Sequence, residues 1–151
     1  MNGKADAEVM TLAGIRRYVF ARHSHPVSAW SRLLTTPLLM VPFWTRAWGP
    51  SLAVAAWFAV NPVMTPEPQR RTALSTRAML GEELWSQDPG QDVPLIGLNV
   101  AGSVVLGAAA VAAWRRRGAW TAVACLASMA VTVTSWTRYA AIHDRSVGTD
   151  G

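Results

Sequence analysis

The sequence has few residues of the kinds that form covalent or metal-linked structure. Its single cysteine, Cys125, cannot form a disulfide within the chain, and its apolar neighbours favour a small buried side chain. No HxxxH, HExxH or CxxC pattern occurs, so the common spacings of paired metal ligands are missing. Residues 1–9 lack the apolar core of a secretory signal, and we expect them to form a disordered cytoplasmic tail. Residues 146–151 are expected to form a second disordered tail.

Charged residues are absent from two long apolar runs, 95–114 and 119–137, which are separated only by residues 115–118. Each run is close to the roughly 20 residues that an α-helix needs to cross a hydrocarbon core of about 30 Å. The two runs therefore predict a transmembrane hairpin. Because neither run contains a charged residue, a proton or ion relay through them has no support.

A shorter pair of apolar segments, 31–47 and 50–64, precedes this hairpin and predicts a second one. Pro37, Pro42 and Pro62 interrupt helical hydrogen bonding, so kinked, thin-spanning and re-entrant arms all agree with the pattern. We expect two crossings here. The predicted fold class is all-α, an integral membrane helical bundle with about four transmembrane helices. It forms one membrane-embedded domain over residues 10–145.

The Lys and Arg residues of the connecting segments set the expected orientation. Four crossings with a cytoplasmic N-terminus place ten of the 14 basic residues inside and only Arg46 and 115–117 outside. This predicts a cell-membrane protein with both termini cytoplasmic. The outer boundary then holds Trp44, Trp48, Trp114 and Trp120, as expected of rings that favour the headgroup level. The Arg triplet alternatively favours three crossings, but that arrangement buries Arg46 in the membrane at high cost.

Residues 65–94 form the one long polar connection, and within it 73–85 has helical composition. Leu74, Ala78, Gly81 and Trp85 share one face, so this short helix is amphipathic. We expect it either to lie in the inner membrane interface or to pack on the bundle as a connecting helix.

The net charge of +5 does not indicate a nucleic-acid partner, because the basic residues are scattered at segment ends and do not line one face. We predict no nucleic-acid binding. Basic residues on the cytoplasmic side favour contact with the lipid bilayer, with anionic headgroups or with a protein partner. The residues expected to make this contact are Arg16, Arg17, Arg22, Arg70 and Arg71.

The topology returns several polar residues to the inner face, and their types suggest metal or acid–base chemistry. The candidate polar site comprises His23, His25, Ser28, Arg32, Asn61, Glu82, Glu83 and His143, with His23, His25, Glu82 and His143 as metal candidates. In the alternative explanation these are solvated groups at helix ends, and His25 caps a helix that begins at Pro26. We also expect Arg32 and Glu82 to approach one another. No cofactor is predicted.

Three functional hypotheses follow from these residues, and the third, a transporter, would need a polar pathway that the two late runs do not offer. The first is a non-enzymatic multi-pass membrane protein with a polar, basic cytoplasmic face for a partner or anionic headgroups. The second is a small lipid-modifying membrane enzyme with a His/Glu metal or acid–base site at the inner interface. The sequence favours the first, because no catalytic spacing is present.

Small and polar residues also recur at helical spacing along the two late runs. The first stripe is Asn99, Ser103 and Gly107, and the second is Ala124, Ser128 and Thr132. Such stripes let membrane helices approach closely, and we expect Asn99 to form an interhelical hydrogen bond.

Three short motifs resemble those of an uncharacterised family of small bacterial and archaeal membrane proteins. They are an RHxxPxSxWxR pattern at 22–32, Asn61 with Pro62, and an LGExxW pattern at 80–85. The resemblance covers about residues 18–145. It implies the membrane architecture and no activity.

A fainter similarity, over about 20 residues, is to iron-dependent membrane dioxygenases that shorten 2-hydroxy fatty acids. Tyr18, His23 and Pro37 match that pattern. The second histidine of the pattern would fall at Ser31 or Arg32, where this chain has none.

Overall fold

The computed structural model describes Gly14 and residues 22–149. These residues form six α-helices and two short 3-10 helices, and no strand occurs among them, so the all-α prediction is confirmed. The α-helices are α3 (Pro26–Leu34), α4 (Val41–Thr45), α5 (Trp48–Met64), α6 (Leu74–Gln87), α7 (Val93–Trp114) and α8 (Gly118–Thr149). The 3-10 helices are η1 (Thr36–Met40) and η2 (Pro89–Asp92). Residues 1–9, predicted to be a disordered tail, lie outside the described part of the chain.

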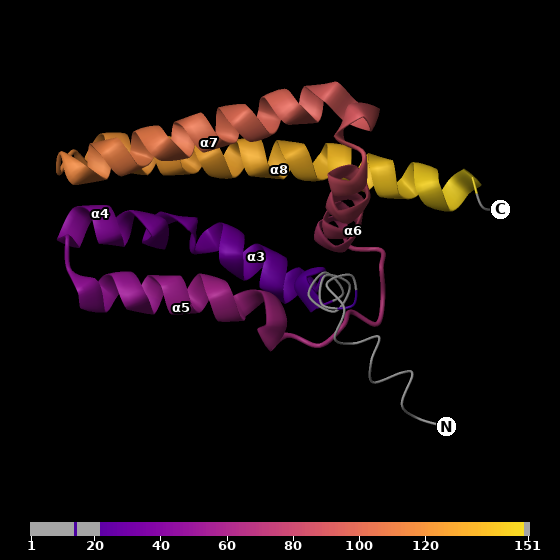
Figure 1. The fold of residues 1–151 in the computed structure, drawn as a ribbon, viewed down its shortest axis with the longest axis horizontal. Helices are drawn as coiled ribbons and strands as arrows, with labels where there is room; N and C mark the ends of the chain where they lie inside the picture. Colours follow the sequence, from indigo (N-terminus) through magenta and orange to yellow (C-terminus); the bar gives the residue numbers. More distant parts are fainter. Residues whose placement is uncertain (1–13, 15–21, 150–151) are drawn as a thin grey trace.

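Helices α7 and α8 pack along one another as an antiparallel hairpin (Figure 1). The Asp92 side chain caps α7 by accepting a hydrogen bond from Leu95 N at 3.2 Å, and Pro94 occupies the first turn. Both helices are long and apolar enough to cross a membrane, and only 17% of the most apolar stretch of each is buried. Outward-facing apolar side chains of this kind suit contact with lipid.

The N-terminal half forms a second, broken hairpin, in which α3, η1 and α4 pack against α5 (Figure 1). The expectation of four transmembrane helices is wrong here, because among the described residues only α7 and α8 meet the length and composition of a span. The predicted arm 31–47 is interrupted at Thr35, where α3 ends and η1 begins. Pro37 lies in the first turn of η1, and Pro42 lies in the first turn of α4. Proline lacks the backbone N–H that would continue the helix. The second arm, α5, is 17 residues long and falls short of a span.

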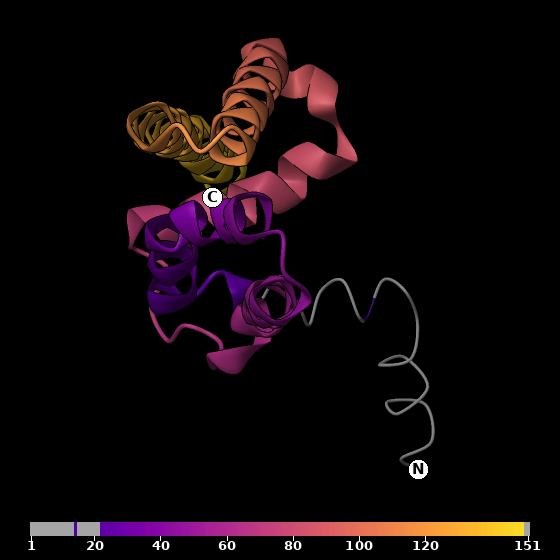
Figure 2. The ribbon, with the colours of Figure 1, turned by 90° about the vertical axis from the view of Figure 1, so that its left-hand side faces the viewer.

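Helix α6 lies across one end of the two hairpins and packs mainly on α8 (Figures 1 and 2). This agrees with the connecting helix that was one of the two alternatives for residues 73–85. Gly81 permits the close approach, because a Cβ atom there would overlap the Tyr139 backbone. Helix α8 runs past α6 to Thr149, so residues 146–149 are helical and the predicted tail at 146–151 is wrong over that stretch.

The turns of the two hairpins meet at the opposite end of the bundle. The Arg46 guanidinium lies 4.0 Å from the centre of the Trp114 ring and also donates a hydrogen bond to the Trp114 carbonyl. In the reciprocal contact, the Arg116 guanidinium lies 5.7 Å from the centre of the Trp44 ring. These cation–π contacts fix the two turns to one another, each using a basic and an aromatic residue.

Candidate functional site

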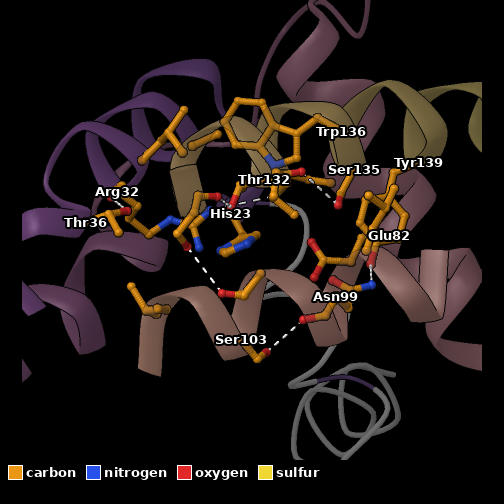
Figure 3. Close-up of a pocket in the computed structure, with 18 of the residues that line it drawn as sticks. His23, Arg32, Thr36, Glu82, Asn99, Ser103, Thr132, Ser135, Trp136 and Tyr139 are labelled. Atoms are coloured by element: carbon orange, nitrogen blue, oxygen red, sulfur yellow. Dashed lines mark hydrogen bonds between the residues drawn. The ribbon is translucent and has the colours of Figure 1, made fainter. Parts of the chain in front are cut away.

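A cavity of about 450 Å³ lies between the two hairpins, near the end at which α6 crosses them (Figure 3). This volume is within the roughly 300–1,000 Å³ typical of small-molecule sites. Its polar lining is His23, Arg32, Thr36, Glu82, Asn99, Ser103, Ser128, Thr132, Ser135 and Tyr139. Its apolar lining includes Leu33, Phe58, Leu98, Leu106, Val131 and Trp136. The cavity therefore joins a polar region with an apolar wall.

Arg32 supplies the positive charge of the cavity. It comes from the last turn of α3, where its Nε donates to the Ser28 carbonyl at 3.3 Å. One Nη contacts the Met79 sulfur at 3.7 Å, which is a weak acceptor. A guanidinium has five N–H donors, so most of the donors of Arg32 make no hydrogen bond to the described residues.

Glu82 supplies the negative charge from α6, on the other side of the cavity (Figure 3). Burial raises the pKa of Glu82, and the positive charge of Arg32 opposes that rise. The expected approach of Arg32 and Glu82 is confirmed to this extent, since they line one cavity and interact electrostatically. Within residues 22–149, however, they form no ion pair within 4.0 Å.

His23 lies between Arg32 and Glu82 in the close-up view (Figure 3). Burial, assisted by the Arg32 charge, lowers the pKa of His23 to about 4. The imidazole is therefore neutral at pH 7, and a neutral ring presents one donor and one acceptor.

Residues from the small-residue stripes of α7 and α8 form another part of the cavity wall. Asn99 donates to the Tyr139 hydroxyl at 2.8 Å, which confirms the expected interhelical hydrogen bond. Its amide also donates to the Leu95 carbonyl at 2.9 Å. Ser128 donates to the Gly102 carbonyl at 3.5 Å, a second and longer link between the two helices. Two residues of each stripe thus line the cavity, whereas Gly107 and Ala124 lie outside its lining.

Two predicted site residues, Ser28 and Asn61, lie outside the cavity lining and connect α3 to α5. The Ser28 hydroxyl lies 3.1 Å from Asn61 Oδ1 and 3.2 Å from the Asn61 carbonyl oxygen. Asn61 Nδ2 donates to the Ser31 hydroxyl at 2.9 Å. Both residues are buried, with 0% and 4% of their surface exposed, so their polar groups are satisfied by one another.

The remaining predicted residues, His25, Glu83 and His143, also lie outside the cavity lining. His25 Nδ1 accepts a hydrogen bond from Val27 N at 3.2 Å, which confirms the cap expected before Pro26. In the described part of the chain, no three histidine, cysteine or acidic residues gather closely enough to hold a metal ion. The four metal candidates are therefore not brought to a common point.

Several lining residues were not among the predicted site residues. Tyr139, Ser135 and Trp136 come from α8, Phe58 from α5 and Thr36 from η1. The stripe of Ser128 and Thr132 was the available signal, because residues one turn further along α8 fall on the same face. Nothing in the sequence pattern identified Phe58 or Thr36 as facing the same space.

The basic residues predicted to meet headgroups or a partner are only partly described. Arg70 and Arg71 are exposed in the connection before α6, and Arg71 pairs with Glu67 at 3.4 Å. Arg22 is half-buried and begins the described segment. Arg16 and Arg17 lie outside the described residues.

The chain belongs to the family of unknown function DUF6653, whose family model matches residues 5–147. The match covers nearly the whole chain and carries no assigned activity. No curated protein and no solved structure is significantly similar to the chain.

Proposed function

We propose that this protein is a multi-pass membrane protein that binds a lipid-like amphiphile between its two hairpins and has no catalytic role. Helices α7 and α8 cross the bilayer, and the N-terminal hairpin lies beside them as a shorter embedded pair. Both termini are cytoplasmic, so α6 lies at the inner interface. The bilayer is then the source of the ligand, and the basic connection before α6 faces anionic headgroups.

The observation that carries this proposal is the composition of the cavity wall. Charged and hydroxyl side chains line the cavity together with leucine, phenylalanine and tryptophan side chains. Phe58 and Leu106 belong to the middle of α5 and α7, whereas Glu82 belongs to α6 at the bundle end. A headgroup near α6 with chains directed along the hairpins would match both parts of the lining.

A test of this proposal is to fill the cavity. Thr132 lines the cavity, and Thr134, two residues further on the same helix, is exposed outside it. The full chain is purified in mild detergent and its co-purifying lipid is counted by mass spectrometry. We expect Thr132→Trp to lose bound lipid and Thr134→Trp to retain it. Equal retention by both variants, or no bound lipid in the unmodified protein, would contradict the proposal.

A second candidate function is an acid–base reaction on the same ligand. It is favoured by one observation, the presence of neutral His23 and of Glu82 in one cavity. Incubation of the protein with a membrane lipid extract would then yield a product detectable by mass spectrometry. His23→Gln and Glu82→Gln would each abolish that product, while the binding of lipid to the apolar wall would remain.

A further inference from the structure

The cavity contains one formal positive charge and one formal negative charge that do not pair with each other. Its other lining residues are uncharged, since His23 is neutral at pH 7. Arg32 makes a single carbonyl hydrogen bond and a weak sulfur contact. Among the described residues, the Glu82 carboxylate forms neither a hydrogen bond nor an ion pair within 4.0 Å. A partly buried guanidinium and a partly buried carboxyl group, whose pKa burial raises, therefore face the same space.

An unpaired charge away from water costs free energy unless an opposite charge or strong hydrogen bonds compensate it. Direct pairing of Arg32 with Glu82 would provide that compensation, but they extend from opposite sides of the cavity (Figure 3). A ligand that carries both charges would compensate the two groups at once. An anionic ligand would satisfy Arg32 alone, and a cationic ligand would satisfy Glu82 alone.

We infer that the cavity binds a zwitterionic amphiphile, with its phosphate or carboxylate group on Arg32 and its primary ammonium group on Glu82. The inference rests on the proposed function and specifies the ligand class. A guanidinium suits phosphate and carboxylate groups because it donates parallel N–H bonds to them. An ammonium with three N–H donors suits a carboxylate, and it would favour the ionised form of Glu82.

The groups that surround these charges agree with such a head. The Tyr139 hydroxyl accepts from Asn99, which leaves its own hydrogen to donate beside Glu82. The neutral His23 ring lies between the two charged groups and adds no charge of its own. The apolar lining, which includes Leu33, Phe58 and Leu106, is available to hydrocarbon chains.

The experiment compares three probes on the full chain in detergent, with binding measured by native mass spectrometry. The probes are phosphatidylethanolamine, phosphatidylglycerol of the same chain length, and free phosphoethanolamine. We expect phosphatidylethanolamine to bind about tenfold more tightly than phosphatidylglycerol, because only it pairs with both charges. Equal binding of the two lipids would overturn the inference and leave the proposed function standing. Binding of neither lipid would overturn both.

Variants identify the contacts and matched controls test their position. Glu82→Gln should remove the preference for phosphatidylethanolamine. Arg32→Gln should weaken the binding of both lipids, whereas Arg32→Lys should retain the preference. The controls are Glu83→Gln, next to Glu82 but outside the cavity, and Arg117→Gln in the α7–α8 turn. Loss of the preference in Glu83→Gln, or its persistence in Glu82→Gln, would overturn the assignment. Free phosphoethanolamine binding as tightly as the lipid would support the zwitterion and contradict the lipid-like ligand.

Discussion

Two sets of polar side chains in this bundle differ in what satisfies them. Ser28 and Asn61 hydrogen-bond to one another between α3 and α5, and Asn99 does the same with Tyr139 between α7 and α8. Arg32 and Glu82 instead face the cavity. The first group explains packing, because its members hydrogen-bond to one another between helices. The second group has capacity left for a ligand.

The protonation of His23 gives a prediction at the residue scale. Its pKa of about 4 in the folded protein lies below the usual value of 6.5. Above pH 6.5 the ring is neutral in both the folded and unfolded states, so it does not affect stability. Between pH 6.5 and 4, the unfolded chain binds a proton that the folded protein excludes. The free energy of unfolding should therefore decrease as the pH is lowered, and at pH 4 it should be about 3 kcal/mol below its value at neutral pH.

The measurement compares denaturation of the wild-type protein and His23→Gln in detergent across this range. The variant cannot take up that proton, so its stability should fall less steeply than that of the wild type. Arg32 and Glu82, which line the same cavity, are present in both proteins. Parallel loss of stability in the two proteins would contradict the assigned pKa of His23.

Among the elements, α7 and α8 were the most predictable from sequence, and the N-terminal hairpin the least. Long uncharged runs allow only a membrane or core helix, and α7 begins within two residues of the expected boundary at 95. In 31–47, helical and 3-10 backbone compete over a stretch that contains Pro37 and Pro42, and composition does not decide where the break falls. The end of α8 was also missed, because polar residues after 137 can extend a helix that packs on α6.

The contact of α6 with α8 depends on Gly81, which gives a prediction at the element scale. A Cβ atom at position 81 would overlap the Tyr139 backbone, so Gly81→Ala must push the two helices apart. We expect a loss of about 1–3 kcal/mol in the free energy of unfolding. Gly97→Ala is the control, because its Cβ would meet nothing within 4 Å. The control should be neutral or slightly stabilising, and equal loss in both variants would show that helix separation is not the cause.

At the scale of the whole molecule, the sequence identified Arg32, Glu82 and His23 but not the space that they share. Those three residues come from α3, α6 and the segment before α3, and the cavity forms only when the two hairpins pack. Residue type and spacing report neighbours along one helix. They do not report which faces meet between helices, so Phe58 and Trp136 could be found only in the folded structure.

The arrangement of the two ends supports the orientation that the basic residues predict. Six described arginines lie toward α6: Arg22, Arg70, Arg71, Arg77, Arg138 and Arg145. Four lie at the joined turns, namely Arg46, Arg115, Arg116 and Arg117. Two of those four, Arg46 and Arg116, are placed over tryptophan rings, a combination suited to the headgroup level. By the positive-inside rule, the excess at the α6 end favours our proposal that this end faces the cytoplasm.

Single-cysteine labelling tests this orientation. Cys125 is buried and is first replaced by Cys125→Ala, after which Arg117→Cys reports the turn end and Gly90→Cys reports the α6 end. A membrane-impermeant maleimide is added to intact spheroplasts that express the full chain. Because the excess of arginines favours a cytoplasmic α6 end, we expect labelling of Arg117→Cys before lysis and of Gly90→Cys only after it. The reverse pattern would place the Arg triplet in the cytoplasm and the cavity near the outer leaflet, while labelling of both before lysis would exclude a membrane-spanning hairpin.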